Sequence, residues 1–214
     1  MPLPQFAREY LCMWPSDASV KALDMEAWAK LQRPRTLDLW PEKFAYAFDC
    51  APDGSSAALC AAWRDEAGDA WVEVIDHRQG TDWLVAAVRD IAPTTPHPVA
   101  YDRIGANMDA ALRLQSLRPA VRSEGLHYVN GVVPAESGFV RELNAGRLRH
   151  YGQISLTAAL DGATWRVLEG ARLWGRKASA SDLTPAVAAA LALHHYDTVV
   201  AVQGDSSELS SIFG

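Results

Sequence analysis

The sequence contains few cysteines and no long apolar segment. Its three cysteines, Cys12, Cys50 and Cys60, lack the paired spacing of a zinc site, and an odd number without a disulfide pattern is typical of a reducing compartment. No segment approaches the roughly 20 apolar residues that cross a bilayer. The N-terminus lacks the basic region and apolar core of a secretory signal. We therefore expect an intracellular protein without a membrane partner.

The chain also lacks an overall excess of positive charge. Its net charge of −6 disfavours a nucleic-acid partner. The charge is unevenly distributed, however, because residues 103–177 carry eleven basic and six acidic side chains, and the rest of the chain carries −11. A protein with one basic face beside an acidic site fits this distribution. The net charge therefore does not exclude a nucleic-acid-binding enzyme.

Length and composition predict one domain with short extensions. The 214 residues, 49% of them hydrophobic, suffice for a single domain with a full core. Residues 1–40 are predicted to form a leader or linker with short helices, one of them over residues 16–31. The main domain is expected over residues 41–203, followed by a flexible tail over residues 204–214. Such a leader is compatible with a fragment of a longer protein.

The hydrophobic pattern predicts alternating strands and helices. Strands are predicted over residues 44–50, 56–64, 70–77, 99–102, 126–129, 164–169 and 171–175. Helices are predicted over residues 80–91, 106–117, 134–144, 155–161 and 185–195, the last with Thr184 as its N-cap. This order indicates an α/β fold of the RNase H type. Its mixed central sheet has an antiparallel meander of three strands, a fourth strand parallel to the first, and flanking helices.

Two aspartates fall at the ends of predicted strands. Asp49 lies near the end of the first strand and Asp102 ends the fourth. The Pro52 and Gly54 that follow Asp49 would suit an ordinary turn aspartate. If the first and fourth strands are neighbours, however, both carboxylates emerge at the same edge of the sheet.

A third carboxylate is expected from the last helix. Asp182 precedes this helix and Asp197 lies at its far end. We prefer Asp182, because the helix start is expected at the sheet edge, although an acidic residue there also stabilises a helix N-terminus. Asp53 is either a turn residue or a fourth ligand. Carboxylates bind Mg²⁺ and Mn²⁺, and two such ions about 4 Å apart catalyse phosphodiester hydrolysis.

Five short segments also occur in an order and spacing that match one known family. They are residues 6–11 with Trp14, residues 44–54, residues 99–102 with Gly105, residues 147–152 with Leu156, and residues 182–190. Together they resemble the C-terminal nuclease domain of the large terminase subunit of tailed bacteriophages. The resemblance implies a metal-dependent endonuclease that cuts concatemeric viral DNA in the host cytoplasm during genome packaging. It also implies catalytic, metal-binding roles for Asp49, Asp102 and Asp182.

The same resemblance implies several partners. A full-length subunit would act on double-stranded viral DNA through an ATPase half, with a small terminase subunit and the portal protein. The phosphate-binding pattern GxxxxGK[ST] does not occur in this sequence. We therefore expect that this chain by itself neither hydrolyses ATP nor translocates DNA.

Basic residues near these segments are candidates for DNA contact. Arg103 directly follows Asp102 and either clamps a phosphate or pairs with an acidic neighbour. Arg172, Arg176 and Lys177 precede Asp182. They are expected to contact the DNA backbone, because two metal ions alone do not hold a duplex. His150, within the 147–152 segment, is either DNA-proximal or structural. The full set is Arg103, Arg147, Arg149, His150, Arg172, Arg176 and Lys177.

Two other functions fit the same pattern. An RNase H or a junction resolvase would use these carboxylates on a different nucleic acid, and would prefer an RNA–DNA hybrid or a four-way junction over linear duplex. A catalytically idle RNase H-like docking module would keep the fold but would bind no Mn²⁺.

Overall fold

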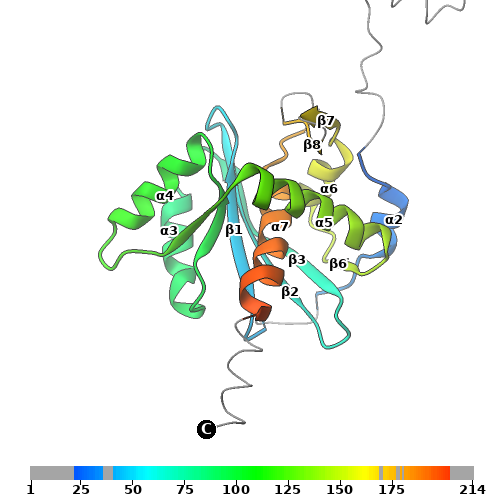
Figure 1. The fold of residues 1–214 in the computed structure, drawn as a ribbon, viewed down its shortest axis with the longest axis horizontal. Helices are drawn as coiled ribbons and strands as arrows, with labels where there is room; N and C mark the ends of the chain where they lie inside the picture. Colours follow the sequence, from blue (N-terminus) through cyan, green and yellow to red (C-terminus); the bar gives the residue numbers. More distant parts are fainter. Residues whose placement is uncertain (1–21, 36–40, 169–170, 177–178, 180, 203–214) are drawn as a thin grey trace, which may run out of the picture.

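A six-stranded mixed sheet forms the centre of the protein (Figure 1). The computed structural model describes residues 22–35, 41–168, 171–176, 179 and 181–202. The strands are β1 (Ala45–Cys50), β2 (Ser56–Arg64), β3 (Ala70–Gln79), β4 (Val99–Asp102), β5 (Ser123–Leu126) and β6 (Leu148–His150), and their order in the sheet is β5-β4-β1-β2-β3-β6. Predictions for residues 1–21 and 203–214 and for Lys177 lie outside the described residues.

The topology confirms the predicted RNase H-like sheet. Strands β1, β2 and β3 form the antiparallel meander, and β4 lies parallel beside β1. All six residues of β1 are buried, as is usual for a central strand covered on both faces. The pairing of Asp49 with Ala58, and of Ala58 with His77, defines one end of the sheet. This end is called the acidic end below.

Helices cover both faces of the sheet (Figure 1). One face packs against α3 (Leu84–Ile91) and α4 (Ala106–Ser116), and the other against α5 (Val133–Asn144), α6 (Ile154–Asp161) and α7 (Thr184–His195). Short connecting turns are η2 (Ala92–Thr94), η3 (Tyr128–Val132) and η4 (Tyr196–Val200), the last two π-helical. The mixed sheet with helices on both faces is the α/β architecture that the sequence pattern predicts.

Helix α7 lies close to the sheet because small side chains face it. Ala47 of β1 and Ala58, Cys60 and Ala62 of β2 share a core cluster with the alanine-rich α7, whereas the larger side chains of these strands face α3 and α4. The Cys60 thiol lies 3.4 Å from the carbonyl oxygen of Pro185, in the first turn of α7. Alternation along the strands therefore brings the start of α7 to the acidic end.

A separate two-stranded hairpin packs beside α5. It consists of β7 (Trp165–Leu168) and β8 (Ala171–Trp174), which pair antiparallel. Trp174 is buried and meets Phe139 of α5 edge to face, with ring centroids 5.7 Å apart. This contact holds the end of β8 against the core, and Arg176 follows two residues later.

Several local predictions differ from the structure. Among the described residues, the helix predicted over residues 16–31 spans only Met25–Lys30, and the helix predicted over residues 80–91 spans Leu84–Ile91. The strand predicted over residues 126–129 lies instead at Ser123–Leu126, because parallel pairing with β4 places it there, and η3 follows. No strand was predicted at Leu148–His150, whose three residues are too few to show periodicity. Helix α7 begins at Thr184 with Leu183 as its N-cap. The side chain of Asp182 accepts the Thr184 N–H at 2.9 Å.

Part of the predicted leader belongs to the core. Helix α2 (Met25–Lys30) begins at Asp24, whose carboxylate accepts two backbone N–H groups of the first turn. Trp28 is 2% exposed and stacks on His150 with ring centroids 3.5 Å apart. Within the described ranges, no helix combines the length and the apolar character needed to cross a membrane.

Candidate active site

Asp49 and Asp102 lie side by side at the acidic end. Phe48 of β1 is in register with Tyr101 of β4, so the next residue of each strand is one of the two aspartates. Asp49 is 0% exposed and Asp102 is 9% exposed. Burial raises the pKa of Asp49, and it raises the pKa of Asp102 to about 6, in both cases against the lowering effect of Arg176.

Arg176 bridges these two carboxylates. Its Nη1 donates to both carboxylate oxygens of Asp49 at 2.8 Å, and its Nη2 donates to Oδ2 of Asp102 at 3.0 Å. The guanidinium is 19% exposed. The sequence suggested a DNA contact for Arg176, but in this structure it forms an ion pair inside the candidate site.

Asn107 positions Asp49 from the other side. Its Nδ2 donates to Oδ1 of Asp49 at 2.9 Å, while its Oδ1 accepts the backbone N–H of Cys50 at 2.6 Å. Asn107 is buried in the first turn of α4. Sequence reasoning missed it, although its place directly after the β4 segment with Gly105 was a usable signal.

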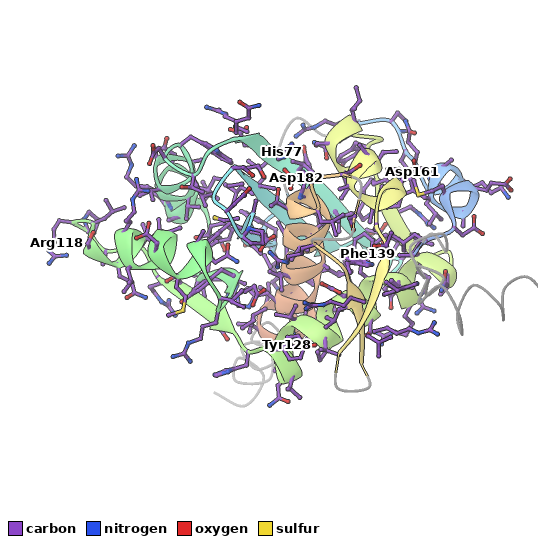
Figure 2. All side chains as sticks on the ribbon, turned by 90° about the horizontal axis from the view of Figure 1, so that it is seen from above. His77, Arg118, Tyr128, Phe139, Asp161 and Asp182 are labelled. Atoms are coloured by element: carbon purple, nitrogen blue, oxygen red, sulfur yellow. The ribbon has the colours of Figure 1, made fainter. Side chains whose placement is uncertain are left out.

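Asp182 faces the site from the start of α7. Its Oδ2 lies 2.8 Å from Nε2 of His77, which lies near the end of β3, and Figure 2 shows the two residues close together. Burial opposes ionisation of Asp182, but hydrogen bonds from His77, Ser56 and Thr184 outweigh it and hold the pKa of this carboxyl well below its usual range. Asp182 is therefore ionised at neutral pH.

Two cavities meet at Arg176. The first has a volume of about 750 Å³ and its lining includes Asp49, Asp182, His77 and Arg176. The second has a volume of about 600 Å³ and is lined by Asp102 and by residues of the β4–α4 loop, η3, α5 and the β7–β8 hairpin. Arg176 belongs to both linings, so its guanidinium separates the Asp182 side of the site from the Asp102 side.

Glu136 is a further buried carboxylate that sequence reasoning missed. It lies on α5, is 2% exposed, and lines the second cavity together with Asp102. Its Oε2 accepts the backbone N–H of Trp174 at 2.7 Å. Burial raises the pKa of Glu136 to about 7. A charged residue one turn before Phe139, on the apolar face of a predicted helix, was the available signal.

The other two candidate acids have local partners. Asp53 lies in the β1–β2 hairpin and lines the first cavity, where its Oδ1 accepts the N–H of Ser55 at 3.0 Å and the hydroxyl at 2.6 Å. This is the pattern of a turn aspartate. Asp197 binds Arg64 at the far end of β2, with Nε and Nη2 at 2.7 and 2.8 Å. Asp182, and not Asp197, therefore shares a cavity with Asp49.

The predicted DNA contacts fall into two groups. Arg103 lines the second cavity and lies 3.2 Å from the ring of His127, and Arg172 is exposed on β8, two residues before the end of the strand. Arg103 and Arg176 line the cavities of the candidate site, whereas Arg172 lines neither cavity.

Arg147, Arg149 and His150 lie at the opposite end of the sheet. His150 pairs with Val72, five residues along β3 from His77, which corresponds to about 17 Å of strand. Arg147 and Arg149 bind acidic side chains there, and His150 is buried under Trp28 and donates a hydrogen bond from Nε2 to the Trp28 carbonyl oxygen. The structure does not bring these three residues to the candidate site.

The donor set suits hard divalent cations, but Arg176 separates its members. Asp49, Asp102 and Asp182 supply carboxylate oxygens, which Mg²⁺ and Mn²⁺ prefer. Among the described residues, no group of three His, Cys, Asp or Glu side chains is already arranged to hold one ion. A divalent ion, in place of the guanidinium, would stabilise the ionised carboxylates of Asp49 and Asp102 against the cost of their burial.

Comparisons with known proteins identify the fold. No protein-family model and no curated protein matches this sequence. The HK97 bacteriophage large terminase is similar in structure, with a TM-score of 0.62 and 15% identity over 80% of this chain and 43% of that chain. This chain therefore spans less than half the length of the HK97 protein.

Isolated nuclease domains are also similar. The large terminase nuclease of the thermophilic phage G20c, with bound magnesium, has a TM-score of 0.54 and 15% identity over 73% of this chain and 83% of that chain. The large terminase nuclease domain of bacteriophage SPP1, with bound manganese, has a TM-score of 0.51 and 11% identity over 78% and 96%. This chain has the fold of these nuclease domains, in agreement with the resemblance of its five segments.

Proposed function

We propose that this chain is the nuclease domain of a phage large terminase, a metal-dependent endonuclease that cuts concatemeric viral DNA during genome packaging. The observation that carries the proposal is the meeting of Asp49 and Asp102 at the ends of neighbouring parallel strands, with Asp182 in the cavity beside Asp49. The shared fold and the metals bound by the G20c and SPP1 domains support it.

In this proposal Asp49, Asp102 and Asp182 hold two divalent ions, Mg²⁺ or Mn²⁺. When bound, the ions supply activation of water and stabilisation of the leaving 3′ oxygen. Asn107 holds the Asp49 carboxylate in place, and His77 does the same for Asp182. The Asn107–Asp49 hydrogen bond is buried and is kept without competition from bulk water, whereas the His77–Asp182 pair is partly exposed.

The DNA strand is proposed to cross the two cavities that meet at Arg176. Arg103 lies beside this path and suits phosphate oxygens, and Arg172, exposed on the hairpin, is proposed as a further backbone contact. Double-stranded DNA is the proposed substrate. The ATPase half of a large terminase, a small terminase subunit and a portal protein are the proposed partners, because the HK97 protein is more than twice as long as the matched region.

The test is cleavage of plasmid DNA by the purified chain in Mg²⁺ or Mn²⁺. Asp49→Asn and Asp102→Asn are expected to abolish cleavage, while Asp90→Asn, an exposed carboxylate of α3, is expected to cut like the parent. If both site variants cut as fast as the parent, the site is assigned wrongly. Faster cutting of an RNA–DNA hybrid or a four-way junction than of duplex would favour an RNase H or a resolvase. No cutting and no Mn²⁺ binding at millimolar concentration would indicate a docking module.

A further inference from the structure

Arg176 occupies the position where a cation would join Asp49 to Asp102. Its three charge-assisted hydrogen bonds engage both oxygens of Asp49 and one oxygen of Asp102. Asp49 also accepts from Asn107, so three of its roughly four lone-pair sites are already used. A metal ion that bridges Asp49 and Asp102 therefore needs oxygen lone pairs that the guanidinium now holds.

The Asp182 side of the site is different. Asp182 and Asp49 both line the first cavity, and the hydrogen bonds that Asp182 accepts come from His77, Ser56 and Thr184. Within the described ranges, no Arg or Lys side chain binds Asp182. Both halves of the site thus border a cavity, but Arg176 donates to Asp49 and Asp102, whereas Asp182 has His77 as its ion-pair partner.

We propose that Arg176 is a resident cation of the metal site, which divalent metal must displace to bind between Asp49 and Asp102, whereas metal binds between Asp49 and Asp182 without displacing it. This inference rests on the proposed function, since it assumes that these carboxylates are metal ligands. It predicts two metal positions of unequal affinity in the DNA-free protein, with the lower affinity at the Asp102 side.

The physical basis is the balance of buried charge. Asp49 is 0% exposed, and a buried carboxylate without a partner is strongly destabilising. The guanidinium stabilises the metal-free protein by neutralising both carboxylates. A divalent ion carries twice the charge and takes over this role, but its binding is weakened by the interaction that it replaces. Once displaced, Arg176 stays at the border of the two cavities, where a phosphate oxygen suits its planar donors.

The experiment is a calorimetric titration of metal-free protein with MnCl₂, without DNA. Arg176→Met keeps the apolar stem but removes the charge. Compared with the parent, we expect it to bind the weaker Mn²⁺ about tenfold more tightly or better, the range expected for loss of a competing charge-assisted hydrogen bond. The matched control is Arg89→Met, which removes an exposed charge from α3, outside the lining of both cavities, and is expected to leave both affinities unchanged. Equal or weaker Mn²⁺ binding by Arg176→Met would overturn the inference.

A second variant and a second readout guard against misfolding. Arg176→Lys keeps a cation but loses the fork that reaches both aspartates, and an intermediate Mn²⁺ affinity is expected. Thermal unfolding should show a lower Tm for Arg176→Met without metal and a larger rise on adding Mn²⁺ than for the parent. If Mn²⁺ binds parent and Arg176→Met alike, and Asp49→Asn abolishes that binding, only the role of Arg176 fails. If no variant binds Mn²⁺, the proposed function fails with it.

Discussion

Both ends of the central sheet carry carboxylates and arginines. The carboxylates are paired with arginines at one end and outnumber the arginine that binds them at the other. At the end away from the candidate site, Arg64 binds Asp197 with two hydrogen bonds, and Glu142 lies 3.1 Å from Arg147 and 3.5 Å from Arg64. Burial raises the pKa of Glu142, but these two arginines outweigh it and lower the pKa overall. Each of these two carboxylates is thus paired with at least one guanidinium group.

At the acidic end, one guanidinium serves three buried carboxylates. Asp49, Asp102 and Glu136 all have a raised pKa, because burial exceeds the effect of Arg176. This end also borders two cavities. A fully paired network stabilises the fold, whereas a buried acidic cluster short of positive charge beside a cavity is typical of a functional site that takes up cations.

The largest effect is expected when the aspartates at the two ends of α7 are replaced one at a time and compared. Asp182→Asn should lower Mn²⁺-dependent cleavage by about 100-fold or more, the loss of a few kcal/mol of transition-state stabilisation. Asp197→Asn, at the other end of the helix, should leave the rate per folded molecule unchanged. Initial rates of plasmid cleavage measure both, and equal losses would remove the contrast between the ends.

A change at the fully paired end should affect stability and not catalysis. Arg64→Met leaves the carboxylates of Asp197 and Glu142 without their shared partner. The free energy of unfolding should fall by about 1–3 kcal/mol, measured by urea denaturation, while cleavage per folded molecule stays the same. A cleavage defect in fully folded Arg64→Met protein would contradict this division of roles.

The raised pKa of Glu136 predicts a pH dependence of stability. Its pKa is about 7 in the folded protein against an ordinary 4.5, so between these values the folded state keeps a proton that the unfolded state has lost. The free energy of unfolding of metal-free protein should therefore fall by about 1–3 kcal/mol as the pH rises from 4.5 to 7. Urea denaturation in chelator measures it.

Two variants isolate this effect. Glu136→Gln should make the decline smaller, with Asp102 and Asp49, whose pKa is also raised, still contributing to it, whereas Glu66→Gln, exposed in the β2–β3 turn, should keep it in full. The same decline in parent and Glu136→Gln would show that another group titrates.

The smallest effect is expected at Asp53. Its hydrogen bonds to Ser55 are those of a turn, so Asp53→Asn should lower stability only slightly and should leave cleavage unchanged. A large loss of cleavage, with Mn²⁺ affinity reduced in the calorimetric titration, would instead make Asp53 the fourth ligand that the sequence left open.

Local patterns in the sequence predicted most of the sheet and part of the site. The bounds of β2 and β4 agree with the prediction, because alternation over a few residues is a property of the strand itself. The parallel pairing of β1 and β4 then made Asp49 and Asp102 neighbours. Strand β6 was missed because its place depends on its partner β3, not on its own three residues.

The arrangement of charges around these aspartates could not be predicted in the same way. Arg176 lies 127 residues from Asp49 and 74 from Asp102, and Glu136 reaches the site only because α5 packs against β8. His150 and its neighbouring arginines belonged to a motif-like segment, yet the β3–β6 pairing places them at the other end of the sheet.

The sequence by itself therefore determined which strands deliver carboxylates, since the period of two and the order of elements are carried by neighbouring residues. Only the tertiary structure decided how those carboxylates are neutralised. Burial and ion pairing depend on residues that are distant in the chain and meet only when the helices and the hairpin close over the sheet. That closure places a single arginine between Asp49 and Asp102 and leaves Asp182 facing an open cavity.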